Sequence, residues 1–574
     1  MTPTAPPWEE TTPPAMTRGR CTVTTVYLVL AAAALTVFTG SVLLLAITVP
    51  YHDWDAFAFG DWSRRIAAGG SLDPLTVGPL AAARPLFYLL QGGVWSVTGV
   101  SFAAGRLLSV FFLLVLVAGV TALSFDRRVA PSVRRLQAGV AVLCLLSVTS
   151  LAQQSVSGLS DVPAAAMLAA VVAVALLDRA TMGAAVALAF LTFGAMVTKP
   201  TVLASLLGLV IWFLIDRSRP LAVRVRWSLA PVGVGLLFGL AYHGIMAARF
   251  HLGLLQYLHT GTDGLWAQRA AAARWDAFLR LDVFGAGLRL PLAFAIVYGL
   301  VRAAGVSHGL TSRIAIPVAL IWGIAGPFTA GAQAGPFSSA EATLTFVGFA
   351  VLLVAVAFAD ENTAPTRTRV TALTLLGLPP LLVWLYMTPY ADRLAATAWP
   401  GLAALVAICL VPGIRVLGQL GFTAALAPLP ILLVALWMSL AGLDGFHGTM
   451  WREYRSLGRD GVWNESRTMN IVLPSAQSTV SLATPLMEGG GSTSVSDPRF
   501  QFFLSGRVVT TTALHCADVS GFAVFVLLTS DESKQLARAA GGLSEPAEWA
   551  ACRSPRLKQL SDGANGFAVF AVPG

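Results

Sequence analysis

The sequence has little charge for its length. Of its 574 residues, 12% are charged and 56% are hydrophobic, whereas soluble domains carry roughly 25% charged residues. This composition excludes an ordinary soluble protein. The apolar residues form continuous runs of about 18–25 residues, the length of a helix that spans a bilayer, so we expect a polytopic α-helical membrane protein rather than a β-barrel.

The sequence gives no sign of a nucleic-acid-binding surface or of a cleavable signal peptide. Nucleic acid is not an expected partner despite the net charge of +9, because the arginines lie mainly in short loops between apolar runs, where positive charge sets helix orientation. No cleavable signal peptide is evident, because the first apolar run, residues 22–49, is too long for one and lacks a clear cleavage site. We expect this run to be retained as the first membrane helix.

The apolar runs divide the chain into three regions. Residues 1–21 form a Pro/Thr-rich tail that we expect to be disordered and cytosolic, residues 22–442 form the transmembrane domain, and residues 443–574 are polar. We expect about thirteen membrane spans, near residues 22–49, 104–124, 137–152, 162–177, 183–198, 201–215, 229–248, 283–302, 314–330, 341–359, 370–387, 395–412 and 420–442.

Arginines occupy alternate loops of this arrangement. They cluster over residues 127–135, 217–226 and 367–369. With the N-terminus inside, all three loops are cytosolic, as the positive-inside rule requires. An odd number of spans then places residues 443–574 outside the membrane.

The polar C-terminal region has the pattern of a small extracytoplasmic α/β or α+β domain. It combines Gly/Ser-rich segments with short β-like runs such as residues 522–528, and its length is sufficient for a core of its own. Cys516 and Cys552 are its only cysteines, and we expect a disulfide between them because the outside of the cell is oxidising. The other three, Cys21, Cys144 and Cys409, are expected to be inert.

Acidic residues gather directly after the first apolar run. Asp53 and Asp55 are followed by Asp61, Arg64 and Arg65. Charge is costly near the hydrocarbon core and persists there mainly where it has a function. One of Asp53 and Asp55 could be a helix N-cap, but two caps two residues apart are not expected. Asp61 and Arg65, at i and i+4, predict a plain surface ion pair.

The rest of the first outer loop, which spans residues 50–103, is rich in aromatic residues. Trp54, Phe57, Phe59 and Trp62 lie beside the charged residues. This mixture predicts an amphipathic helix that lies at the membrane interface.

Further polar residues occur at the outer ends of later spans. Lys199, the only lysine before residue 534, is either a cation that snorkels from a helix end or a phosphate ligand. Asp161 either caps the fourth span or has a function. His251 and His259 lack a clear third ligand, so no zinc site is expected. Other outer cations are Arg84, Arg249, Arg269, Arg274 and Arg393.

These residues, in this order, resemble the polytopic GT-C glycosyltransferases, specifically the branch of the protein O-mannosyltransferases and the lipid A aminoarabinose transferase. The resemblance is carried by roughly the first 215 residues, while the middle of the chain and the C-terminal domain match only in layout. The matching elements are Asp55, Phe59, Arg64-Arg65 and Gly69-Gly70; Arg84-Pro85-Leu86-Phe87-Tyr88; Gly99-Val100 with Arg106; Asp161; Thr198-Lys199-Pro200; and, late in the chain, Arg393 to Pro400.

The first motif departs from the pattern of this superfamily. Its usual Asp-Glu pair is replaced by Asp53-Trp54-Asp55. The spacing favours Asp55 as the leading carboxylate, with Asp53 as the alternative.

The resemblance implies transfer of a sugar from a polyprenyl-phosphate carrier to an envelope glycan, lipid or protein on the outer membrane face, with inversion at the anomeric carbon. Asp55 (or Asp53) and Asp161 are the implied catalytic residues. The implied cations for the donor phosphate are Arg84, Lys199, Arg269, Arg274 and Arg393. Some members of the superfamily need a divalent cation and others do not, and two nearby acids permit Mg²⁺ or Mn²⁺ without demanding it. The Ala/Val/Arg-rich, Lys-poor composition points to the plasma membrane of a high-GC bacterium.

Two other functions stay open. A transporter or flippase of lipid-linked sugars predicts charged residues in the middle of spans and internal repeats, and the sequence has neither. A non-catalytic envelope assembly protein would leave the acids of the first outer loop without a purpose.

Overall fold

The computed structural model describes residues 16–48, 54–70, 72–74, 79–125, 129–148, 150–176, 181–215, 220–258, 288–329, 339–387, 392–437, 439–440, 492–495, 507–510, 524–528, 548, 558–562 and 567–571. For some of them only the backbone is described: 16–22, 48, 54–55, 57–59, 80, 324–329, 339–345, 386–387, 392–394 and the five strands.

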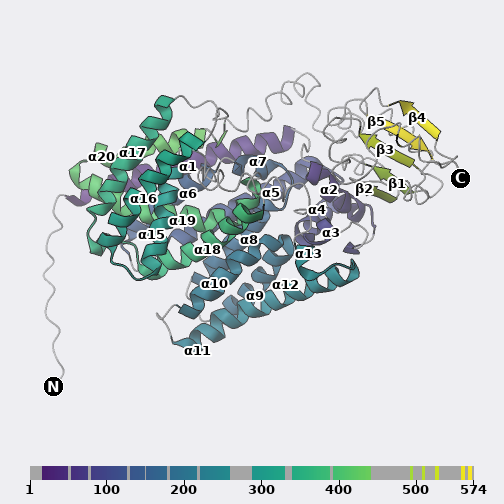
Figure 1. Ribbon diagram of the computed structural model, residues 1–574, viewed down its shortest axis with the longest axis horizontal. Coiled ribbons are helices and arrows are strands. Elements are labelled where there is room, and N and C mark those ends of the chain that lie inside the picture. Colours follow the sequence, from purple (N-terminus) through teal and green to yellow (C-terminus); the bar gives the residue numbers. More distant parts are fainter. Residues whose placement is uncertain are drawn as a thin grey trace.

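The described part of the chain from Met16 to Trp437 is almost entirely helical (Figure 1). In chain order its elements are α1 (Met16–Thr48), α2 (Trp54–Ala67), α3 (Pro79–Ala82), α4 (Pro85–Thr98), α5 (Phe102–Ser124), α6 (Pro131–Leu146), α7 (Leu151–Val156), α8 (Asp161–Leu176), α9 (Met182–Thr198), η2 (Pro200–Val202), α10 (Leu203–Ile215), α11 (Leu221–Arg224), the π-helix η3 (Val225–Leu229), α12 (Ala230–Arg249), α13 (Leu254–Leu258), α15 (Arg289–Ala303), α16 (His308–Thr329), α17 (Ser339–Ala357), η6 (Glu361–Thr363), α18 (Arg367–Met387), η7 (Asp392–Ala398), α19 (Trp399–Leu420) and α20 (Phe422–Leu426).

Each of the predicted apolar runs overlaps a helix of this bundle. Within the described residues five helices are long and apolar enough to cross a membrane: Val23–Ile47, Phe102–Ser124, Leu221–Arg249, Arg367–Leu385 and Ala395–Leu420. Shorter apolar helices of 10–17 residues accompany them. A multi-pass membrane protein is therefore confirmed, while thirteen crossings stay a prediction.

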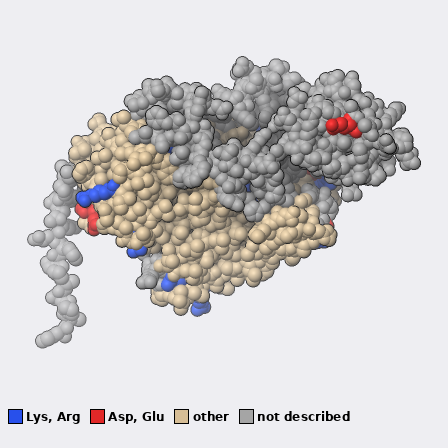
Figure 2. All heavy atoms as spheres, viewed as in Figure 1, with Lys and Arg blue, Asp and Glu red and all other residues tan. Residues whose placement is uncertain are grey.

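The bundle buries small and aliphatic residues inside and leaves large apolar side chains outside. Leu113, Leu116 and Ala169 are buried between α5 and α8, which pack together, whereas Phe190 and Phe238 are 70% and 62% exposed. On the face seen in Figure 2, charged side chains of the described residues lie near the edges, and uncharged residues form the broad surface between them. Such a surface suits lipid, because hydrocarbon chains take the place of water around it.

Arginines close the carbonyl ends of several helices at one end of the bundle, which we call the Arg369 end. Arg369, at the start of α18, donates to the carbonyl oxygens of Ala122 (3.3 Å), Leu123 and Phe125 (3.1 Å) at the end of α5. Arg367 donates to the Ala303 oxygen of α15 at 3.0 Å. The last carbonyls of a helix have no partner within it and carry partial negative charge, so these contacts stabilise the helix ends.

Two adjacent prolines interrupt the hydrogen bonding of α18. Pro379 and Pro380 have no N–H, so the carbonyl oxygens of Leu375 and Leu376, four residues earlier, lose their partners within the helix. Both carbonyls face α10. The Leu376 oxygen accepts a hydrogen bond from Ser205 Oγ at 3.0 Å, and the Leu375 oxygen lies against Gly208.

We expect Gly208→Ala to lower the stability of the protein. An added Cβ would overlap the Leu375 carbonyl oxygen, and overpacking of this kind costs about 1–3 kcal/mol. Gly244→Ala in α12 is the matched control, because a Cβ there meets nothing within 4 Å. Thermal unfolding in detergent should show a lower transition for the first variant only. An unchanged transition for Gly208→Ala would contradict the close packing of α10 on α18.

In the polar C-terminal region, the described residues form a five-stranded mixed sheet with the order β2-β1-β3-β5-β4. β1 is parallel to β2 and β3, β5 is antiparallel to β3 and β4, and a register shift occurs between Gln559 and Ser561. The strands are β1 (Ser492–Val495), β2 (Arg507–Thr510), β3 (Val524–Leu528), β4 (Lys558–Asp562) and β5 (Phe567–Ala571). The predicted strand near residues 522–528 is thus confirmed, whereas an α/β or α+β class stays a prediction.

Candidate active site

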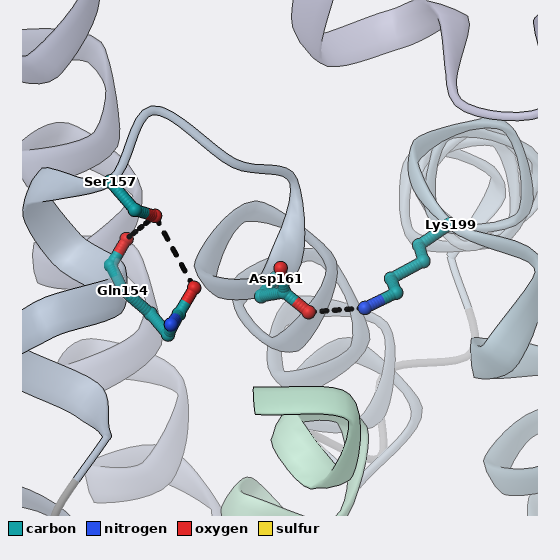
Figure 3. A network of polar contacts seen from close by, with 4 residues as sticks. All are labelled: Gln154, Ser157, Asp161 and Lys199. Atoms are coloured by element: carbon teal, nitrogen blue, oxygen red, sulfur yellow. Dashed lines mark hydrogen bonds and ion pairs between the residues drawn. The ribbon is translucent and has the colours of Figure 1, made fainter. Parts of the chain in front are cut away.

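A buried ion pair joins two of the predicted site residues. Lys199 Nζ donates to Asp161 Oδ1, and the two residues are 1% and 3% exposed (Figure 3). Asp161 is the first residue of α8, and Lys199 caps the C-terminus of α9 and precedes η2. The fold thus brings together residues 38 positions apart, and snorkelling as the reason for Lys199 is wrong because the side chain is buried.

Burial of this ion pair carries a cost in free energy. Transfer of two charges out of water carries a large desolvation penalty, which their attraction offsets only where the geometry is good. Asp161 gains further stabilisation because it lies in the first turn of α8, where the helix dipole favours negative charge.

The loop that leads into Asp161 is fixed from both sides. Ser157 Oγ donates to the Gln154 carbonyl oxygen at 3.1 Å and lies 3.3 Å from its Oε1, on the side of the loop away from Lys199 (Figure 3). Arg106, itself buried, donates through Nε to the Val156 oxygen at 2.7 Å and through a terminal nitrogen to the Leu45 oxygen at 3.4 Å. Arg106 therefore ties α5 to the ends of α1 and α7.

The segment of Arg84 lies against the helix that carries Lys199. Arg84 occupies the N-cap position of α4, and Leu86 packs near Gly194 of α9. On the neighbouring α12, Tyr242 donates to the Ala82 oxygen at 2.8 Å, and His243 Nε2 donates to the Met196 oxygen of α9 at 3.1 Å. The elements α3, α4, α9 and α12 thus form one wall, which carries both Arg84 and Lys199.

The predicted late arginine lies on an element that contacts the same region. Arg393 is part of η7, which packs against α8, α18 and α19. The last turn of η7 lies next to the first turn of α10, because Ser205 Oγ is 3.4 Å from the Thr397 oxygen. The side chain of Arg393 is outside the described residues, so its role as a phosphate ligand stays a prediction.

The aromatic-rich segment after α1 forms two packed helices, α2 and α4. α2 packs on α4, with Ser63 Oγ 2.9 Å from the Tyr88 oxygen, and Trp62 is fully buried. The Trp62 side chain therefore faces the protein interior, and the position of α2 at the membrane interface stays a prediction.

The ion pair of Asp61 is present but is not a plain surface pair. Asp61 accepts from Arg65 at 2.7 Å and from Arg64 at 3.2 Å, and its own side chain is fully buried. The i, i+4 spacing predicted the partner correctly. It could not predict the burial, which comes from the packing of α2 on α4.

The remaining predicted residues are described incompletely or not at all. Asp55 lies in the first turn of α2, and only its backbone is described. Asp53, Arg269, Arg274, Cys516 and Cys552 lie outside the described residues. Cys144 and Cys409 are buried and free, in agreement with an inert role. In the part of the chain that the structure covers, no three His, Cys, Asp or Glu side chains cluster as metal ligands would.

Sequence reasoning missed a buried arginine in the bundle. Arg289, the first residue of α15, is 7% exposed. It lies between Leu288 and Leu290 in the sequence, and an arginine enclosed by apolar residues at a span end is the signal that could have identified it.

Fold and site together define a polytopic α-helical membrane protein. One acidic and one basic side chain, Asp161 and Lys199, form a buried ion pair at one end of its bundle. The fold is similar to that of ArnT from Cupriavidus metallidurans, in crystal structures with bound undecaprenyl phosphate (TM-score 0.51, 14% identity) and in the apo state (TM-score 0.52, 13% identity). Each match covers 95% of this chain and 98% of ArnT.

ArnT is a lipid A aminoarabinose transferase of the GT-C superfamily. The resemblance to GT-C enzymes is therefore confirmed at the level of the fold. No protein-family model and no curated protein sequence matches the chain.

Proposed function

We propose that this protein is a GT-C glycosyltransferase that moves a sugar from a polyprenyl-phosphate carrier to an acceptor on the outer face of the membrane. The observation that carries the proposal is the buried Asp161–Lys199 pair, next to the wall that carries Arg84. A lysine and an arginine at one end of an apolar bundle suit a lipid phosphate, whose head is anionic and whose tail is apolar. The similar fold of ArnT, solved with undecaprenyl phosphate, supports the same class of donor.

The proposed reaction is a single displacement. Asp55, or Asp53 in its place, removes the proton from an acceptor hydroxyl. The hydroxyl oxygen then forms a bond to the anomeric carbon while the bond from that carbon to the phosphate oxygen breaks. Polyprenyl phosphate leaves with the bonding electrons, and attack from the opposite face inverts the anomeric configuration.

The charge that develops on the leaving phosphate needs cations nearby. Arg84 and Lys199 are the first candidates, because the elements that carry them pack together. Arg393 on η7, and Arg269 and Arg274 in the large outer loop, complete the proposed set. Asp161 orients Lys199 through their ion pair.

We also propose an orientation and a cellular setting. The arginines at the Arg369 end favour a cytosolic location for that end, which leaves the Asp161 end and the C-terminal domain outside. Figure 1 agrees with this arrangement, because the sheet lies at the same end of the long axis as α2, α3 and α4. The setting is the plasma membrane of a bacterium, and the acceptor is an envelope glycan, lipid or protein.

Binding of undecaprenyl phosphate tests the class of donor. We expect the purified protein to bind it, and Arg84→Gln to raise the Kd about ten- to a hundredfold, the loss associated with a hydrogen bond to a charged group. Native mass spectrometry of the protein in detergent, titrated with undecaprenyl phosphate, would measure this.

The matched control is Arg135→Gln, which makes the same change at an exposed position near the start of α6. It should leave the Kd unchanged. No binding by the unmodified protein, or an equal loss in both variants, would overturn the proposed class of donor.

A further inference from the structure

The proline interruption of α18 is connected to the active-site region through one serine. Ser205, in the first turn of α10, is fully buried and lies six residues after Lys199. Its Oγ donates to the Leu376 oxygen at 3.0 Å and lies 3.4 Å from the Thr397 oxygen. One hydroxyl therefore contacts both the interrupted helix and η7.

The Leu376 carbonyl needs this contact for a definite reason. In a regular helix its partner would be the N–H of residue 380, which is a proline here. A buried carbonyl without a partner loses the free energy of its hydration. Ser205 replaces the missing donor, which explains a serine in an otherwise apolar helix, Leu203–Ile215.

The same part of α18 is also held by α19. An added Cβ on Gly401 would lie 2.9 Å from the Gly377 nitrogen and 3.0 Å from the Leu376 Cβ, so the two backbones meet almost directly. η7 continues directly into α19 at Trp399. The segments on both sides of this junction, η7 and the first turn of α19, pack against α18. Ala395, Ala396 and Ala398 of η7 are fully buried as a result.

We infer that Ser205 is a positioning residue. It contacts both the Leu376 carbonyl freed by Pro380 and the Thr397 carbonyl of η7. These contacts hold η7, which carries Arg393, next to α8, the helix that starts at Asp161. The inference rests on the proposed function for the role of Arg393. The proline interruption leaves the Leu376 oxygen without its helical partner, Ser205 supplies a donor, and the same hydroxyl lies 3.4 Å from the Thr397 oxygen of η7.

The first test is hydrogen exchange of the full-length protein in detergent. Ser205→Ala should speed exchange of the amides of residues 395–398 by on the order of tenfold, because the segment opens more easily. Ser124→Ala is the control. Ser124, the last residue of α5, is equally buried, but its Oγ donates to the Val120 oxygen of its own helix at 2.9 Å. Unchanged exchange in Ser205→Ala would overturn the inference.

A second-site variant distinguishes the proposed contact from general loosening. Pro380→Ala restores an N–H that can pair with the Leu376 oxygen. In this background the Leu376 oxygen no longer depends on Ser205, whereas the contact of Ser205 with the Thr397 oxygen remains. Ser205→Ala should therefore speed the exchange of residues 395–398 by less than it does in the unmodified protein. Equal effects in both backgrounds would show that Ser205 acts in another way.

Binding of undecaprenyl phosphate tests the link to Arg393. Ser205→Ala should raise the Kd several-fold, by about as much as Arg393→Gln, while Ser124→Ala leaves it unchanged. Faster exchange with an unchanged Kd in Ser205→Ala, alongside a raised Kd in Arg84→Gln, would overturn the link to the donor but leave the proposed function intact. If the unmodified protein binds no undecaprenyl phosphate, the proposed function fails, and hydrogen exchange still decides the role of Ser205.

Discussion

Asp55→Asn is expected to reduce sugar transfer by about a hundred- to ten-thousandfold, the contribution typical of a general base. The change removes the proton acceptor and keeps the volume of the side chain, so folding and the Kd for undecaprenyl phosphate should be unchanged. Transfer would be measured in membranes that contain the protein, with a panel of radiolabelled polyprenyl-phosphate sugars. Asp53→Asn, assayed in parallel, decides which of the two carboxylates leads.

Asp73→Asn is the matched control. The substitution is the same as at Asp55, but Asp73 is half-buried and lies 3.6 Å from Arg249 in a partly exposed ion pair. Such a pair contributes little to stability, and transfer should stay near that of the unmodified protein. Full activity of a variant with asparagine at both 53 and 55 would contradict the proposed mechanism.

Lys199→Met is expected to lower the free energy of unfolding by about 3–5 kcal/mol, because it leaves Asp161 charged and buried without its partner. The double variant Asp161→Asn/Lys199→Met should recover most of that loss, since it removes both charges at once. Neither variant should transfer sugar. Chemical unfolding in detergent measures the first effect, and the transfer assay measures the second.

The partly exposed pair of Arg249 and Asp73 again provides the control. Arg249→Met should change the free energy of unfolding by less than about 1 kcal/mol. If Lys199→Met were as stable as the unmodified protein, the buried ion pair would contribute nothing to the free energy of unfolding. A double variant with normal transfer would reduce the pair to a purely structural role and remove Lys199 from the set of phosphate ligands.

The prediction of helices from sequence worked where the signal was local. A run such as residues 104–124 contains enough apolar residues to specify a membrane helix by itself, and α5 covers Phe102–Ser124. The spacing of Asp61 and Arg65 likewise predicted their ion pair. Neither signal depends on the rest of the chain.

Burial was harder to predict, because it depends on what packs against a residue. Trp62 was placed on an interfacial helix because of its charged and aromatic neighbours, yet its side chain is fully buried within the protein. Lys199 showed the same difficulty, since a cation at a helix end has the same sequence signal whether it snorkels or pairs inside the protein. Arg289 gave only a faint signal, one arginine between two leucines.

The sequence by itself determined that this is a helical membrane protein, roughly where its helices lie, and which few polar residues interrupt its apolar runs. These properties follow from composition and from the length of each run, because every backbone group in a membrane helix is satisfied within that helix. Only the tertiary structure decided that Asp161 meets Lys199, that the segment of Arg84 lies against α9, and that Ser205 serves a carbonyl freed by Pro380. Each of these contacts joins residues far apart in the chain, and their partners are chosen by the packing of helices, which the order of residues along one helix does not specify.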